Sequence, residues 1–175
     1  MGNICGMVMK IKGKKSDRDA FIKALTQDGT EYMGRGADVD IDEETDEYAI
    51  VTGWCKNSIL SALVDNAISM RTEPEHWTIK DNDELTFITL PEASLKYNLD
   101  VEAYSEEAGC CFSEHFLIKK GKWIKDDCVA YNEYELEDFN TKEEAEKELE
   151  MEISDEAWDN GCIVTGGYPS WDFEI

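Results

Sequence analysis

The stretch LDVEAYSEEAGCCFSEHFLIKKGKWIKDDCVA (residues 99–130) decides the fold, because it holds the most regular strand pattern in the chain. Two apolar runs, Val101 to Glu106 and Phe112 to Lys119, are separated by a Gly-containing break. Gly121 then closes the second run onto a third, Trp123 to Tyr131. Short runs joined by glycine turns are typical of antiparallel strands. The stretch therefore predicts three consecutive strands of one antiparallel sheet.

The residues before this stretch alternate between strand and helix patterns. Apolar side chains alternate over residues 4–12, as in a strand, and helical spacing follows a predicted capping box at Ser16–Asp19. This strand–helix unit indicates an α+β domain. Further along we expect a strand pair with its turn at 43–47, a helix beginning at Asn57 or Ser58, a short strand over 85–90 and a short helix over 91–97.

The composition changes after Tyr131. Between residues 133 and 159 there are thirteen acidic side chains and only two lysines. The sequence TKEE (residues 141–144) predicts a capping box, and Ala145, Leu149 and Ile153 follow at helical spacing. We therefore expect one domain over residues 1–175, with an α+β body over 1–131 and an acidic C-terminal helix and aromatic tail over 132–175 packed on it.

The charge restricts the class of partner. The chain has 40 acidic and 17 basic side chains, a net charge of −23. Like-charge repulsion disfavours direct binding to DNA, RNA or an anionic membrane, and favours a basic partner such as a nucleic-acid-binding protein. Carboxylates that merely keep the protein soluble are the alternative. The candidate partner-binding residues are Asp38, Asp40, Asp42, Glu43, Glu44, Asp46, Glu143, Glu144, Glu146, Glu148, Glu150, Glu152, Asp155 and Glu156.

Six cysteines could form a disulfide scaffold, but the rest of the sequence favours a compartment in which thiols stay reduced. The N-terminal residues MGNICGMVMKIKGKK contain no cleavable apolar segment, and no apolar run approaches the roughly 20 residues of a membrane span. We therefore expect a cytosolic protein with reduced thiols.

A cluster of Glu106, Glu107, Cys110, Cys111 and His115 raises the question of thiol catalysis. A nucleophilic cysteine needs a histidine within hydrogen-bond distance. Cys111 and His115 are four residues apart on a predicted strand, about 13 Å in extended geometry, which is too far. Neighbouring glutamates on a strand point to opposite faces and cannot act as an acid–base pair. We expect buried thiols, a surface histidine and no catalytic residue.

Two stretches carry side chains of the types that bind metals. The alternating acids after Asp38 resemble a calcium loop, but Glu43 stands where an EF-hand loop needs Gly, and Ala49 where it needs Glu. Adjacent Cys110 and Cys111 do not form the C-x₂₋₄-C pair of a zinc knuckle. We expect no metal and no cofactor, with a zinc site assembled by the fold as the open alternative.

Two motifs carry a family resemblance. Asn3-Ile4-Cys5, the alternating strand with Gly13 and a helix containing Phe21 resemble the opening of the YubB-like, ferredoxin-like proteins of phages, plasmids and other mobile elements. Residues 103–116 (AYSEEAGCCFSEHF) resemble that family's Tyr-x-Glu-x-x-Gly-x-x-Phe stretch through Tyr104, Glu106 or Glu107, Gly109 and Phe112. The resemblance covers about the first 130 residues, and Ile4 stands where the family usually has Trp. It implies a ferredoxin-like antiparallel sheet and a mobile-element origin, but no catalytic residues.

Charge and resemblance together favour one hypothesis. Acidic proteins of mobile elements can imitate nucleic acid, so we expect a non-enzymatic inhibitor that blocks the basic groove of a host nuclease or CRISPR effector, in the manner of anti-CRISPR or antirestriction proteins. A structural or regulatory interaction module is the second hypothesis. A cysteine- or metal-dependent enzyme is the third.

Overall fold

The computed structural model describes residues 3–77, 85–168 and 170–175. One large antiparallel sheet runs through it, with strands in the spatial order β3-β4-β1-β6-β7-β8-β9, and β2 and β5 form a small parallel pair. The predicted α+β class is confirmed.

The elements are β1 (Ile4–Lys12), α1 (Lys15–Leu25), β2 (Glu31–Met33), β3 (Ala37–Glu44), β4 (Tyr48–Lys56), η1 (Ser61–Asp65), α2 (Asn66–Thr72), η2 (Pro74–His76), β5 (Thr86–Ile88), α3 (Leu90–Lys96), β6 (Asp100–Glu107), β7 (Phe112–Lys119), β8 (Lys122–Glu135), α4 (Lys142–Leu149), α5 (Asp155–Asn160) and β9 (Cys162–Gly166).

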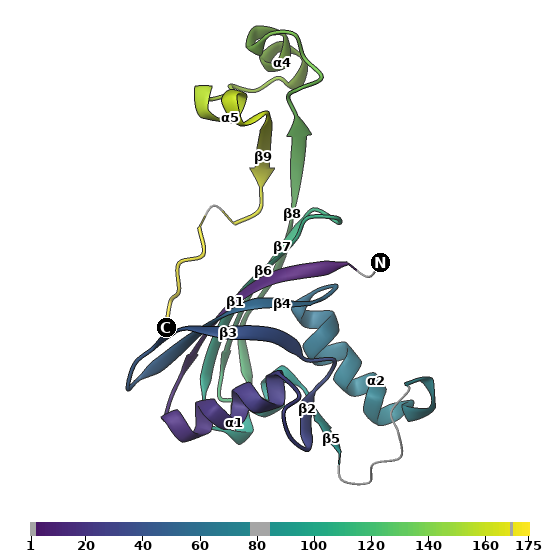
Figure 1. Ribbon diagram of the computed structural model, residues 1–175, viewed down its shortest axis with the longest axis vertical. Coiled ribbons are helices and arrows are strands. Elements are labelled where there is room, and N and C mark those ends of the chain that lie inside the picture. The colour runs from purple at the N-terminus through teal and green to yellow at the C-terminus, as the bar shows by residue number, and fades with distance from the viewer. Residues whose placement is uncertain (1–2, 78–84, 169) are drawn as a thin grey trace.

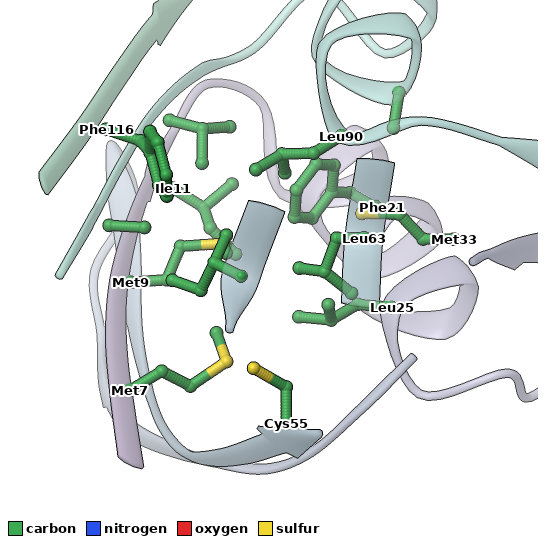
Figure 2. Packing of buried hydrophobic residues seen from close by; sticks show 14 of the residues in the cluster. Met7, Met9, Ile11, Phe21, Leu25, Met33, Cys55, Leu63, Leu90 and Phe116 are labelled. Carbon is green, nitrogen blue, oxygen red and sulfur yellow. The ribbon is translucent and has the colours of Figure 1, made fainter. Parts of the chain in front are cut away.

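The main core lies between the large sheet and the helices α1, η1 and α3. Figure 2 shows side chains of β1, α1 and the later elements meeting in this layer. On β1 the alternation read from the sequence is confirmed, since Cys5, Met7, Met9 and Ile11 are at most 3% exposed. Phe21 and Leu25 of α1 and Leu63 of η1 complete the same cluster. Burial of these apolar side chains is the main driving force for the layer.

The predicted strand triplet forms the middle of the sheet. β6 pairs with β1 on one side and with β7 on the other, and β7 pairs with β8. Lys120 and Gly121 both have positive φ, at 47° and 83°, as a tight hairpin turn requires. The break between β6 and β7 contains Cys111, which also has a positive φ of 52° and precedes β7 rather than belonging to it.

The start of α1 differs from the prediction. α1 begins at Lys15, and the residue before it makes no side-chain cap, so Ser16 is inside the helix and the predicted capping box is wrong. Arg18 fixes this corner instead, because its guanidinium donates to the backbone oxygen of Gly13 at 2.9 Å. A full capping box occurs at α3, where the hydroxyl of Thr89 accepts from Glu92 N and the Glu92 carboxylate accepts from Thr89 N.

The C-terminal region forms a lobe that stands away from the helices of the body (Figure 1). We call residues 136–163 the acidic lobe. Its helix α4 ends at Leu149, because Glu150 adopts the left-handed conformation at φ 55°, and Ile153 is reached from the following loop. α5 then begins after Ser154, whose hydroxyl accepts from Ala157 N at 3.1 Å. A small separate core holds the lobe together: Leu136, Ala145 and Ile153, with Phe139, Leu149, Met151, Ala157, Trp158 and Ile163 around them.

Arg18 is the buried cation of the body. Its side chain is fully buried and donates to the carbonyls of Gly13, Thr45 and Asp46, so it ties the start of α1 to the turn between β3 and β4. Loss of the guanidinium leaves these carbonyls without their donor in a buried corner.

We predict that Arg18→Ala lowers the free energy of unfolding by about 2–4 kcal/mol, because buried acceptors lose a charged donor and a cavity remains. Urea denaturation measures this change. Lys15→Ala on the same helix is the control, since that exposed side chain contacts only Asp19 and Glu44 among its described acidic neighbours. Equal effects of the two substitutions would contradict the role given to Arg18.

Candidate functional site

The acidic lobe contains eleven acidic side chains and only two basic ones, Lys142 and Lys147. Four of the predicted partner-binding residues lie on α4, two follow it, and two open α5. All of them except Glu146 are exposed to solvent. In chain order they are Glu143, Glu144, Glu146, Glu148, Glu150, Glu152, Asp155 and Glu156.

Three of these carboxylates stabilise the lobe itself. Glu144 accepts from the backbone N–H of Asn140 at 3.1 Å, and Glu146 accepts from that of Ile153 at 3.0 Å. Asp155 lies 2.7 Å from the ammonium group of Lys142, which lowers the pKa of the Asp155 carboxyl. The remaining five have neither a hydrogen bond nor an ion pair within the described part of the chain: Glu143, Glu148, Glu150, Glu152 and Glu156.

The other predicted acidic stretch lies at the opposite edge of the sheet. Asp38 and Asp40 are exposed on β3, which is the first strand of the sheet order, whereas β9 of the acidic lobe is the last. Glu43 accepts from the hydroxyl of Tyr48 at 2.5 Å, and the ammonium of Lys15 beside Glu44 lowers the pKa of that carboxyl. Asp42 and Asp46 are exposed beside them. The fold therefore does not bring the two stretches into one surface.

The thiol cluster does not form a nucleophile–base pair. Cys110 is exposed, so the expectation of buried thiols is wrong at this position, and the neighbouring Glu107 carboxylate raises the pKa of its thiol. Burial raises the pKa of Cys128. A raised pKa keeps a thiol protonated and weakens it as a nucleophile. The two glutamates do point to opposite faces, since Glu106 is exposed and Glu107 is buried.

The expectation of a surface histidine is wrong. His115 is only 2% exposed, because the C-terminal tail (residues 167–168 and 170–175) packs against the sheet face on which it lies. The ring of His115 stacks on Tyr104 at 3.9 Å between centroids, and Tyr168 of the tail meets both rings edge-on. Trp171 stacks on the same Tyr104. The sequence showed the aromatic residues of the tail but not which face of the sheet they cover.

Glu102 anchors this tail and was not singled out by the sequence. Its carboxylate is fully buried and hydrogen-bonds through Oε1 to His115 Nε2 at 2.8 Å. Its Oε2 accepts from the backbone N–H groups of Glu174 at 2.6 Å and Ile175 at 3.1 Å. The hydroxyl of Tyr104 donates to the Asp172 carbonyl at 2.8 Å. Both oxygens of this buried carboxylate therefore have hydrogen-bond partners, as a buried polar group requires.

Glu102, His115 and Glu174 are also the set whose ligand atoms lie within 4.8 Å of one another, as a metal site requires. Both oxygens of Glu102 are already engaged, and Glu174 pairs with Lys125 at 2.5 Å, which lowers the pKa of the Glu174 carboxyl. Metal binding would have to break the bonds that hold the tail. We assign the set to tail anchoring.

A hollow of about 480 Å³ lies at the other end of the body, between the C-terminal end of α1 and the neighbouring ends of β3 and β4. Arg35 and Lys56 contribute to its wall, and the guanidinium of Arg35 lies 5.7 Å from the ring centroid of Trp77. Its lining combines these cationic and aromatic groups with the carboxylate of Asp38.

Comparison with family models, with curated proteins and with solved structures finds no match to this chain. No helix in the part of the chain that the structure describes has the length and apolar character needed to cross a lipid bilayer.

We predict that Glu102→Ala releases the tail, because the N–H groups of Glu174 and Ile175 lose their acceptor. Hydrogen exchange at these two amides should become at least about tenfold faster, while exchange in β1 stays slow. Glu174→Gln is the matched control, since it removes the exposed pair with Lys125 and keeps the backbone bond to Glu102. Unchanged exchange in Glu102→Ala would show that the aromatic contacts alone hold the tail.

Proposed function

We propose that the protein is a non-enzymatic inhibitor that binds a cationic, nucleic-acid-binding protein through its acidic lobe. The observation that supports this most directly is the set of five exposed carboxylates that have no partner among the described residues, carried on a unit that projects from the body (Figure 1). Carboxylates that stabilise a fold form ion pairs or accept hydrogen bonds from backbone N–H groups, as Glu144 and Glu146 do here. The five others raise the self-repulsion of the lobe without contributing an internal contact.

The physical basis is imitation of phosphate groups. Closely spaced carboxylates on a rigid scaffold present the negative potential that a basic groove is built to receive. Such complementarity accelerates association and makes it steeply dependent on salt. The partner is therefore a nuclease, CRISPR effector or comparable protein whose nucleic-acid groove the lobe would occupy, as anti-CRISPR or antirestriction proteins do.

The proposal extends to fold family and origin. We place the first part of the chain in a ferredoxin-like arrangement, which the strand order β3-β4-β1-β6 and the two helical crossovers support. We regard α4 as the extra acidic C-terminal helix added to that arrangement. Together with the two YubB-like motifs, this supports origin in a phage, plasmid or integrated element and action in the cytosol of a bacterial host.

A structural or regulatory interaction module is the second candidate. Trp54 on β4 is 41% exposed and lies next to the edge strand β3, so it offers apolar contact area there. A partner that binds there would tolerate high salt, because burial of apolar surface is not screened by ions.

We predict that replacing Glu143, Glu148, Glu150, Glu152 and Glu156 by Gln abolishes capture of the partner, because the unpaired carboxylates of the lobe are removed. Glu144, Glu146 and Asp155 are kept, since they hold the lobe together. The measurement is a pull-down from bacterial lysate. Wild-type capture at about 50 mM salt should fall by one or more orders of magnitude at about 200 mM.

The matched control carries the same change in net charge at the other edge of the sheet. It replaces the exposed acids of the β3–β4 region by their amides: Asp38, Asp40, Asp42, Asp46 and Glu47. Capture should be retained. Equal losses in both variants would mean that net charge matters and the lobe does not. Capture that is indifferent to salt and to both variants would favour the apolar module.

A further inference from the structure

The two edges of the large sheet differ in how they are protected. β3 bears exposed acids and a register shift between Ile41 and Glu43, both of which discourage another strand from pairing with it. β9 has the sequence CIVTG, with no charge, no proline and β-branched residues in its middle. Its Val164 is 54% exposed. In a chain of net charge −23, an uncharged edge strand of high β-propensity is unusual.

The backbone of this edge is available for pairing. β9 ends the sheet order, so within the described residues only β8 pairs with it. Leu136 N donates to Gly161 O at 2.8 Å, and the register continues through Tyr134 opposite Ile163. Because bonded pairs alternate in an antiparallel ladder, the N–H and C=O groups of residues 162, 164 and 166 point away from β8. A further strand would find donors and acceptors there.

A hollow of about 400 Å³ lies beside the same edge. Its lining combines apolar and acidic groups: Glu152, Ser154, Glu156, Ala157, Asn160, Cys162, Ile163 and Val164. Ala157 and Ile163 also pack against the small core of the lobe, and this packing holds their side of the hollow in place. Glu152 and Glu156 are two of the unpaired carboxylates described above.

We propose that an extended, Lys/Arg-rich segment of the partner adds to the open edge of β9 as an extra strand, with its basic side chains reaching Glu152 and Glu156. This inference rests on the proposed function and identifies the kind of segment that the lobe receives. Main-chain hydrogen bonds supply affinity, and alternate side chains supply specificity. The apolar side chains of the segment would lie on the face of the exposed Val164, and the cations that alternate with them would point to the opposite face and reach the acidic rim.

Charge decides between this occupant and others. A second copy of the chain would bring another eleven carboxylates to the same edge, and a nucleic acid would bring phosphates. Both are opposed by repulsion. A cationic segment is attracted and also relieves the repulsion within the lobe.

The test uses a fluorescein-labelled peptide of alternating Lys and Val, titrated with the full-length protein and followed by fluorescence anisotropy. Val164→Pro removes an outward N–H without touching the ladder with β8, a position where proline is tolerated. We expect it to weaken binding by about tenfold or more, since strand pairing is blocked at its centre. Val164→Ala keeps the N–H and should stay within about threefold of wild type. Thermal melting checks that both variants fold.

A second measurement is hydrogen exchange at the Val164 amide, which should slow when the peptide binds. Equal affinities of Val164→Pro and wild type, with the amide unprotected, would overturn strand addition. If the five-Gln variant then still lost binding, acidic docking would survive without strand pairing. Conversely, if the five-Gln variant bound normally and only Val164→Pro failed, the proposed electrostatic function would fall. Dimerisation of the wild type that Val164→Pro abolishes would assign the edge to a second copy and overturn the proposal.

Discussion

The structure depends on covering both faces of β6 and β7, the strands at the centre of the sheet. Helices cover one face, where Ala103 and Phe116 enter the main core. The other face carries Tyr104 and His115, and the aromatic tail covers it. The buried carboxylate of Glu102 holds this tail in place. Because the tail has to reach this face, the chain leaves the body along β8, forms the acidic lobe and returns along β9, which pairs with β8. The lobe is therefore an insertion between two paired strands.

The acidic residues fall into two populations with different roles. Glu102 and Glu114 are buried and accept from backbone N–H groups, in the case of Glu114 that of Ile59 at 2.8 Å, with the Ser105 hydroxyl as a further donor at 2.6 Å. These carboxylates build the fold, because each satisfies donors that would otherwise be orphaned. The unpaired carboxylates of the lobe satisfy none. The two populations carry the same charge, so net charge does not distinguish them. They differ in whether the carboxylate accepts hydrogen bonds from other described residues.

The sequence predicted where strands and helices lie better than it predicted which residues cover or hydrogen-bond one another in the folded chain. The alternation over residues 4–12 and the strand triplet were readable because side-chain period and glycine turns are local properties. The burial of His115 was not readable, since its cover comes from residues more than fifty positions later. The helix end at Glu150 also escaped, because the apolar spacing continues to Ile153 although the backbone turns left-handed. Likewise, neighbouring acids in the sequence gave no sign that Glu146 caps a loop while Glu148 is free.

The same distinction links the stability of the lobe to its binding. Three fully buried apolar residues and their partly buried neighbours hold the lobe together against the repulsion of eleven carboxylates. So small a core leaves a narrow margin, and the repulsion reduces it further. A cationic strand on β9 would add ladder hydrogen bonds and neutralise Glu152 and Glu156 at once. Because a ligand that binds only the folded form stabilises that form, binding of the partner would raise the stability of the folded lobe.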